Sequence, residues 1–426
     1  MKRYIVGEMT FDDLNLVPPI LNALRQKGYT EPTPIQAQSI PVLLKGRDLL
    51  GVAQTGTGKT ASFAIPMLQT LHINQQAGHW PKGIKALIIT PTRELAIQID
   101  EGIAAYSKGM SLYHTVIFGG VKQHHQVRKL QRGVDILTAT PGRLLDLMNQ
   151  GYVKLDNLRI FTLDEADRML DMGFINDVKK VIAKLPDQRQ SMFFSATMPP
   201  SITDLANTLL TDPVRVEVTP ASSTTDTVEQ KLFMVDKAKK KELLLHVLQD
   251  ETINSVLIFT RTKHGANKLS KHIDGAGIKS EAIHGNKSQT QRQKALKNFK
   301  AGRTKVLVAT DIAARGIDIN ELSHVINFEI PNEPESYVHR IGRTGRAKNT
   351  GIAMSFCDID ERAYIKAIHK LIDKEIPIDK DHPFPAHHNM EHPEIDMRPQ
   401  RKGGPRAAGR RSRPHKQRPF KGRRKS

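Results

Sequence analysis

The sequence predicts an α/β protein of parallel sheets flanked by helices, followed by a basic C-terminal tail. Three observations predict it. Short β-branched runs alternate with amphipathic stretches, the alternation restarts after a Ser/Thr-rich segment, and residues 398–426 are rich in Gly, Pro and Arg. The alternation indicates crossover helices between parallel strands, and such sheets bind ligands beyond the carboxyl ends of their strands. At 426 residues the chain is long enough for two or three domains of about 150 residues each.

The strand-like runs divide the chain into two similar halves. In the first half we expect strands at residues 84–90, 115–118, 134–138, 158–163, 191–194 and 214–218. In the second half we expect them at 255–259, 280–283, 305–309, 324–328 and 351–356. The intervening Ser/Thr-rich segment has no hydrophobic periodicity and is typical of a linker. The predicted division is domain 1 over 1–216, a linker over 217–227, domain 2 over 228–380 and a disordered tail over 381–426.

A phosphate-binding loop is indicated in the first half. Its residues are Ala53, Gln54, Thr55, Gly56, Thr57, Gly58, Lys59 and Thr60. Such a loop supplies backbone N–H groups to a polyphosphate, a lysine to the β and γ oxygens and a hydroxyl to Mg²⁺. Ala53 stands where the usual pattern has its first glycine, but Gly56 and Gly58 allow the backbone to approach the phosphates closely.

Two carboxylates follow a later strand of the same half. Asp164 and Glu165 come directly after residues 158–163, where one can hold the water shell of Mg²⁺ and the other can orient the attacking water. A phosphate loop alone is compatible with a structural role. The loop and the acidic strand end together predict an ATPase.

The charge of the chain predicts a polyanionic partner. The formal net charge is +20, and residues 398–426 contain 13 Lys or Arg and no acidic residue, which leaves +7 for residues 1–397. Nucleic acid is the polyanion that we expect, and a solvated solubility tail is the alternative. Cys357 is the only cysteine, so no intramolecular disulfide can form. A signal-type segment and long apolar runs are absent, which predicts a cytoplasmic protein without a membrane partner.

The second half has no phosphate loop, but it has two spaced arginines. Arg343 and Arg346 lie in the run 339–346, interleaved with glycine. A guanidinium pairs well with phosphate oxygens, so both can reach a γ-phosphate as arginine fingers. A solvated basic loop is the alternative. Arginine fingers across a cleft would make hydrolysis depend on domain closure.

At these residues the chain resembles one family, the DEAD-box RNA helicases, from about residue 11 to residue 378. The segment 28–36 resembles the family's Q motif, with Phe11 at the upstream aromatic position. Further matches occur, in the family's order, at 91–96, 119–120, 140–143, 195–197, 257–262, 289–292 and 309–318. The resemblance implies two tandem RecA-like domains, ATP and Mg²⁺ as cofactors, and RNA as partner.

The resemblance also implies roles for individual residues. ATP would be bound by Phe11, Gln36, the loop residues 53–60 and Asp318, with Gln36 reading the adenine edge. Catalysis would use Lys59, Asp164, Glu165, Arg343 and Arg346, and Mg²⁺ would lie at Thr60 and Asp164, largely through water. Coupling between the sites would use Asp167, Ser195, Thr197 and His339. RNA would contact Thr92, Arg93, Gly120, Thr140, Arg143, Arg261, Thr310 and Asp311, a set suited to a sugar-phosphate track and not to reading bases.

Within the family, the segments 259–267 and 282–288 and the basic tail look most like the bacterial RhlE subgroup. That likeness implies ribosome assembly or RNA turnover as the setting. The expected activity is sequence-independent RNA binding with unwinding of short duplexes. A translocating DNA helicase and an ATP-gated RNA clamp or annealing chaperone are the alternative functions.

Overall fold

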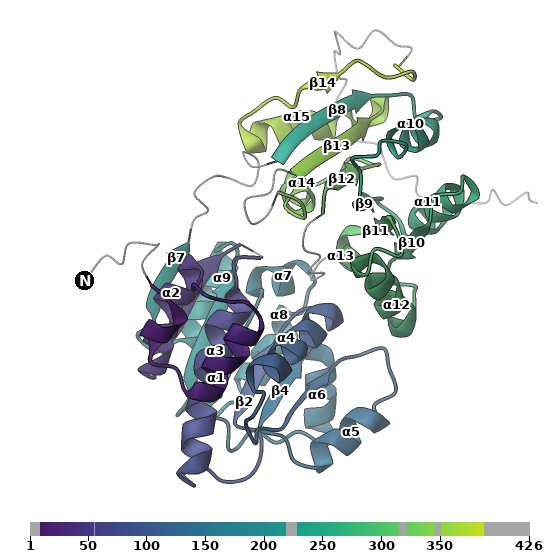
Figure 1. The fold of residues 1–426 in the computed structure, drawn as a ribbon. Helices are drawn as coiled ribbons and strands as arrows, with labels where there is room; N and C mark the ends of the chain where they lie inside the picture. The colour runs from purple at the N-terminus through teal and green to yellow at the C-terminus, as the bar shows by residue number, and fades with distance from the viewer. Residues whose placement is uncertain (1–8, 55, 219–227, 315–321, 346–350, 387–426) are drawn as a thin grey trace, which may run out of the picture. The chain divides into compact units, whose positions relative to one another are not determined.

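The computed structural model describes residues 9–54, 56–218, 228–314, 322–345 and 351–386, and the predicted parallel sheets are confirmed (Figure 1). The first sheet has the order β3-β4-β2-β5-β6-β1-β7, with all pairs parallel. Its strands are β1 (Leu49–Ala53), β2 (Ala86–Ile89), β3 (His114–Ile117), β4 (Ile136–Ala139), β5 (Ile160–Leu163), β6 (Gln190–Ser195) and β7 (Val214–Val218). Its helices are η1 (Phe11–Leu14), α1 (Pro18–Gln26), α2 (Pro34–Leu44), α3 (Lys59–Gln76), α4 (Arg93–Tyr106), α5 (His124–Gln131), α6 (Pro141–Asn149), α7 (Ala166–Asp171), α8 (Ile175–Ile182) and α9 (Pro200–Leu209).

The second sheet has the order β10-β11-β9-β12-β13-β8-β14, again with parallel pairs. Its strands are β8 (Val228–Met234), β9 (Val256–Phe259), β10 (Ser280–Ile283), β11 (Val306–Ala309), β12 (His324–Asn327), β13 (Gly351–Cys357) and β14 (Ile378–Asp379). Its helices are α10 (Lys240–Val247), α11 (Lys263–Gly275), α12 (Gln289–Lys300), α13 (Asp311–Ala314), α14 (Pro334–Ile341), η2 (Ile359–Glu361) and α15 (Arg362–Ile372).

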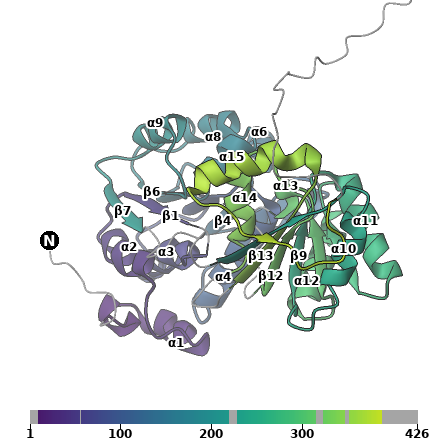
Figure 2. The same ribbon diagram turned by 90° about the horizontal axis from the view of Figure 1, so that it is seen from above.

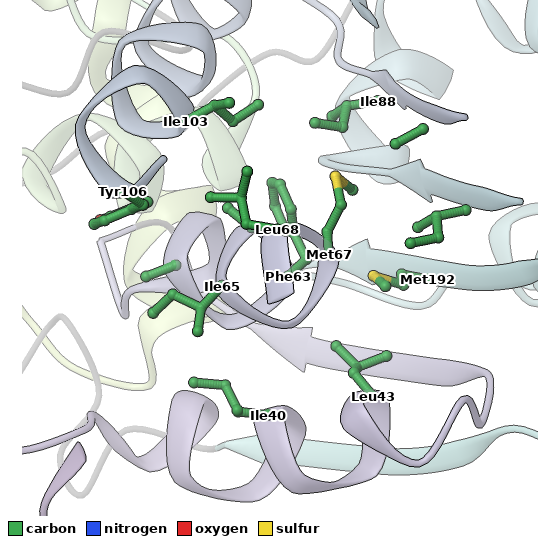
Figure 3. Close-up of a cluster of buried hydrophobic side chains, with 14 of the residues drawn as sticks. Ile40, Leu43, Phe63, Ile65, Met67, Leu68, Ile88, Ile103, Tyr106 and Met192 are labelled. Atoms are coloured by element: carbon green, nitrogen blue, oxygen red, sulfur yellow. The ribbon is translucent and has the colours of Figure 1, made fainter. Parts of the chain in front are cut away.

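The inner strands β2, β4 and β5 are buried on both faces, to which successive side chains point alternately. Along β2, Ile88 packs in the core with α2, α3 and α4, whereas Leu87 and Ile89 pack in the core with α6, α8 and α9. Figure 2 shows α2 and α3 on one side of this sheet and α8 and α9 on the other. Side chains from α2, α3, α4, β2 and β6 meet around α3 (Figure 3).

Most predicted strands exist within one or two residues of their expected ends, but three strands were not predicted. These are β1, which leads into the phosphate loop, β8 and the two-residue β14. β7 includes residues 217 and 218, which fall in both the predicted strand 214–218 and the predicted linker 217–227. Residues 219–227 and 387–426 lie outside the described part, so the division into domains, linker and disordered tail stays a prediction.

The first residues of the predicted tail are described by the structure. Residues 381–386 pack against the second sheet, because Phe384 contacts its core and the Ala386 N–H donates a hydrogen bond to the Met234 carbonyl at 3.2 Å. His382 adds a ring contact to Phe233 at a centroid distance of 5.6 Å.

We expect Gly51→Ala to destabilise the first sheet. A Cβ at Gly51 would lie 2.5 Å from a ring carbon of Phe194, whose ring packs against Phe63 at a centroid distance of 5.5 Å. Overpacking of this kind costs about 1–3 kcal/mol, measurable by urea unfolding. The matched control is Gly102→Ala, where a Cβ meets its neighbours at 3.6 Å or more and helix propensity improves. Equal stability of the two variants would contradict the close packing at Gly51.

Candidate nucleotide site and nucleic-acid face

The predicted site residues of the first sheet lie at the carboxyl ends of its strands. Those assigned to RNA follow β2, β3 and β4, which are neighbours at one end of the strand order. Those assigned to ATP hydrolysis and coupling follow β1, β5 and β6, which are neighbours in the rest of the sheet. The two groups therefore adjoin between β2 and β5.

The phosphate loop connects β1 to the N-terminus of α3. Gly58 is the N-cap of α3 in a left-handed conformation, and Lys59 is its first residue. Free N–H groups and the helix dipole make such a terminus attractive to phosphate. The Thr57 hydroxyl donates to the Gln54 carbonyl at 2.8 Å, which closes the loop. Thr55 lies outside the described residues.

Two buried polar atoms of opposite charge lack a protein partner at this edge. Among the described residues, none forms a hydrogen bond with the Lys59 Nζ or with the Asp164 Oδ1, although their residues are 6% and 2% exposed. A buried charge without a partner is costly, so these atoms fit a ligand that offers both phosphate oxygens and a cation. Burial raises the pKa of Asp164 to about 7, and the charge of Lys59 opposes that rise.

Glu165 is held in a strained turn beside Asp164. Its φ of 56° is left-handed, and its carboxylate accepts a hydrogen bond from the Arg168 guanidinium at 2.6 Å. Burial acts to raise the pKa of Glu165, but the charges of Arg168 and Lys59 outweigh burial, so the pKa lies below its usual range. Glu165 is therefore ionised and can accept a hydrogen bond from water. Arg168 was missed in the sequence because its role depends on this turn.

The three first-sheet residues predicted for coupling form one hydrogen-bonded cluster. The Asp167 carboxylate accepts from the Thr197 N–H at 2.9 Å and from the Thr197 hydroxyl at 3.0 Å. The Asp167 N–H donates to the Ser195 hydroxyl at 3.2 Å, and that hydroxyl donates to the Thr197 carbonyl at 2.8 Å. The cluster joins the start of α7 to the segment that follows β6.

The Q-motif residues differ in how well they suit a base. The Gln36 amide donates to the Gly58 carbonyl at 3.1 Å and accepts from the Thr33 N–H at 3.0 Å, so it is fixed beside the phosphate loop. One donor hydrogen and one acceptor lone pair of the amide remain for a ligand. Phe11 is 3% exposed and packs in the core, which leaves little of its ring for a base.

Arg93 and Gly120, both predicted to face RNA, touch each other. Gly120 has a φ of 74°, and a Cβ there would overlap the Arg93 guanidinium. Only glycine fits this approach without displacing the arginine. Thr92 caps α4 by accepting from the Leu95 N–H at 3.3 Å, which sets the direction of the helix that carries Arg93.

Arg143 is tied to the turn after β3 through a glutamine that the sequence did not single out. Its guanidinium donates to the Val121 carbonyl and to the Gln126 side-chain oxygen, each at 3.1 Å. Gln126 also exchanges two hydrogen bonds with the Phe118 backbone, at 3.2 and 3.0 Å. Thr140 is the N-cap of α6, the helix that carries Arg143, so the segments after β3 and β4 are joined through Arg143 and Gln126.

Asp311, predicted to contact RNA, pairs with a buried arginine that the sequence did not single out. Its carboxylate forms a bidentate pair with Arg340 at 2.6 and 2.8 Å, and 29% of the Asp311 side chain stays exposed, so the RNA contact stays a prediction. Arg340 is 1% exposed, donates to the Asn327 side chain and the Glu329 carbonyl, and lies over the Phe259 ring. The pair ties together the ends of β9, β11 and β12. A buried arginine needs such a partner, which the sequence alone does not locate.

Arg261 follows β9 and is positioned by a buried chain of charges. Its guanidinium pairs with Glu361 at 3.1 Å, and the other Glu361 oxygen pairs with the buried ammonium of Lys240. Lys240 also pairs with Asp358 at 3.1 Å. Arg261 keeps 29% of its side chain exposed, so it can still contact a ligand.

The remaining predicted residues of the second half are partly described. Thr310 is buried at the start of α13, His339 lies on α14 and Arg343 is buried just beyond α14. Asp318 and Arg346 lie outside the described residues. The roles of all these residues stay predictions.

The comparisons with known proteins identify the family. The model of the DEAD/DEAH box helicase matches residues 33–205, and that of the helicase conserved C-terminal domain matches residues 239–348. The chain is 41% identical over 368 residues to the DEAD-box ATP-dependent RNA helicase CshA of Bacillus subtilis, covering 86% of this chain and 73% of that protein. It is 43% identical over 371 residues to the RNA helicase CrhR of Synechocystis sp., covering 87% and 74%.

Solved structures agree with this result. S. cerevisiae Dbp5 bound to RNA and ADP BeF3 superposes with a TM-score of 0.76 at 32% identity, covering 87% of this chain and 95% of that chain. A DEAD box protein from Methanococcus jannaschii has a TM-score of 0.52 at 39% identity, covering 87% and 99%. Two tandem RecA-like folds are thereby confirmed. The chain belongs to the DEAD-box family of ATP-dependent RNA helicases.

The relatives do not support the narrower likeness to the RhlE subgroup, because those reported above carry the names CshA and CrhR. That likeness stays a prediction without support. No helix within the described ranges is long and apolar enough to cross a membrane.

We expect Asp311→Ala to destabilise the second sheet, because it leaves the buried Arg340 guanidinium without its carboxylate. Hydrogen bonds to charged groups contribute about 1.5–3 kcal/mol, so the melting temperature should fall measurably in a thermal scan. The control is Asp360→Ala, which removes an exposed carboxylate paired only with Lys237 among the described residues. This variant should keep the original melting temperature. Unchanged stability of Asp311→Ala, with weaker RNA binding, would favour the predicted RNA contact over a structural role.

Proposed function

We propose that the chain binds ATP with Mg²⁺ at the β1–β5–β6 edge and uses hydrolysis to separate short RNA duplexes or remodel RNA–protein complexes. The observation that carries the proposal is the pair of buried, unpartnered polar atoms on Lys59 and Asp164 beside an ionised Glu165. Lys59 would bind phosphate, and Thr60 and Asp164 would hold Mg²⁺ largely through water. Bound Mg²⁺ would neutralise charge that develops on the transferred phosphoryl group.

Glu165 would orient and accept a proton from the attacking water, while Arg168 keeps the carboxylate in place. Asp167 would pass the nucleotide state to the segment after β6 through its bonds to Thr197. These bonds would respond to any shift of α7, since Asp167 is the second residue of that helix.

We infer that RNA is bound without sequence preference. Hydroxyls, glycine backbone and guanidinium groups on the face formed by Thr92, Arg93, Gly120, Thr140 and Arg143 suit sugar and phosphate, and contacts of that kind carry no base information. We further propose a cytoplasmic setting, in ribosome assembly or RNA turnover, the setting implied by the likeness to the RhlE subgroup. Crosslinking and sequencing the bound RNA would test that setting.

The catalytic proposal predicts opposite behaviour of two variants. Lys59→Ala should weaken ATP binding by about tenfold or more, because it removes a charge-assisted bond to phosphate. Glu165→Gln should keep ATP and RNA bound but lower turnover by about 10²-fold or more, the range of a lost general base. Steady-state ATPase and RNA dissociation rates measure both, with the exposed Lys45→Ala as control. Unchanged hydrolysis by Glu165→Gln would remove the proposed role of that carboxylate.

Arg343 is proposed to stabilise the γ-phosphate during transfer. Arg343→Ala should reduce RNA-stimulated turnover by about 10³-fold while ATP affinity changes far less. Arg303→Ala, which removes an exposed arginine of the same half, is the matched control. A thermal scan separates loss of chemistry from loss of fold, since Arg343 is 5% exposed. A folded Arg343→Ala protein with normal ATPase would overturn the assignment.

A further inference from the structure

The turn after β3 and the helix α5 carry an exposed basic surface that the predicted RNA contacts do not include. We call it the α5 surface, and its exposed residues are Lys122, His124, His125, Arg128, Lys129 and Arg132. Residues 114–134 contain four Lys or Arg and no acidic residue. This segment therefore carries +4, more than half of the +7 on residues 1–397. Concentration of charge on one helix is the electrostatic footprint of a polyanion partner.

The α5 surface is rigidly joined to the predicted RNA face. Gln126 is 7% exposed and bonds at once to the Phe118 backbone and to the Arg143 guanidinium. Val127 and Leu130 bury the opposite side of α5 in the core. The helix therefore cannot turn its basic side chains away, and Lys122 lies two residues after Gly120.

Carboxylates on neighbouring elements bond to side chains outside the α5 surface. Asp100 accepts from His114 at 2.7 Å, and Asp135 pairs with Lys85 at 2.7 Å. Asp146 accepts from Gln150 at 2.8 Å and lies 3.5 Å from Arg143. None of these carboxylates is recorded in a pair with Lys122, Arg128, Lys129 or Arg132, among the residues that the structure describes.

We propose that the α5 surface binds the phosphate backbone of RNA beyond the turn at residues 119–120, so that the RNA track of the first sheet continues along α5. The inference rests on the proposed RNA face. Lysine and arginine side chains on a fixed helix neutralise phosphates, and the site would therefore accept RNA of any sequence. The eight residues of α5 span about 12 Å at 1.5 Å per residue, long enough to follow more than one phosphate.

The first test compares two variants of the full chain that lose equal charge. One is K122A/R128A/K129A/R132A, and the control is K154A/K179A/K180A/K184A, which removes four exposed lysines of the same half. RNA affinity is measured by fluorescence anisotropy across a salt series. Each phosphate contact on a single strand contributes about −0.7 to the slope of log K against log salt, so loss of two to four contacts should reduce its magnitude by about 1.4–2.8. The control should keep the original slope.

The second test varies RNA length. The α5 variant should bind a short RNA, and hydrolyse ATP with it, as the unmutated chain does, but should lose the extra affinity gained when the RNA is extended at one end. The proposal would be overturned by a loss of RNA affinity that is equal at all RNA lengths, by an unchanged slope of log K against log salt, or by an equal loss of affinity in the control. Unchanged RNA binding would also overturn it and would leave α5 as a solvated face or a site for an acidic protein. Failure of the unmutated chain to bind even short RNA would instead refute the RNA face itself.

Discussion

Parallel pairing of every strand is the constraint on which both sites depend, because it brings all the carboxyl ends to one edge of each sheet. The ladder continues to the last residues before the loops: Asp164 donates its N–H to the Ile89 carbonyl at 2.9 Å, and Thr140 donates to Ile117 at 3.1 Å. Neighbouring strands lie about 4.8 Å apart, so the first residues of the nucleotide site and of the RNA face are separated by a single step between β5 and β2. Within this sheet, structural coupling between the two ligand sites therefore has to cross only one strand step.

Buried charged side chains at the carboxyl ends of the two sheets are of two kinds. Those with a protein partner stabilise the fold, and those without one are available to a ligand. Arg340 and Arg168 each have a carboxylate within 2.8 Å, and removing the partner would leave an uncompensated charge in the interior. The polar atoms of Lys59 and Asp164 have no such partner among the described residues. A fold tolerates their burial when a ligand completes the pairing, so the missing partners indicate the nucleotide more directly than the sequence pattern does.

The sequence predicted the sheets, most strands and the grouping of the site residues, because β-branched runs and loop motifs are local signals. It did not predict β8 as a strand, whose pairing with β13 comes from a distant segment, nor β14, which has only two residues. The residues missed in the site have the same cause. Asp311 was singled out by its place in a motif, but its partner Arg340 lies 29 residues away and meets it only in the folded sheet. Gln126 and Glu361 gave no signal, since an amide or a carboxylate becomes a positioning group only through its partners.

Glu165 shows how local strain can join the chemistry to the coupling cluster. Four non-glycine residues among those described have positive φ, and Glu165 is the buried one. Such a conformation costs about 1–3 kcal/mol and persists when its surroundings fix it, here through the bond from Arg168. Helix α7 begins at the next residue, so the turn fixes the direction of the helix that carries Asp167. The carboxylate proposed to orient water and the carboxylate bonded to Thr197 are therefore two residues apart, on either side of one turn. A movement of Glu165 would shift the start of α7 and with it the Asp167 carboxylate.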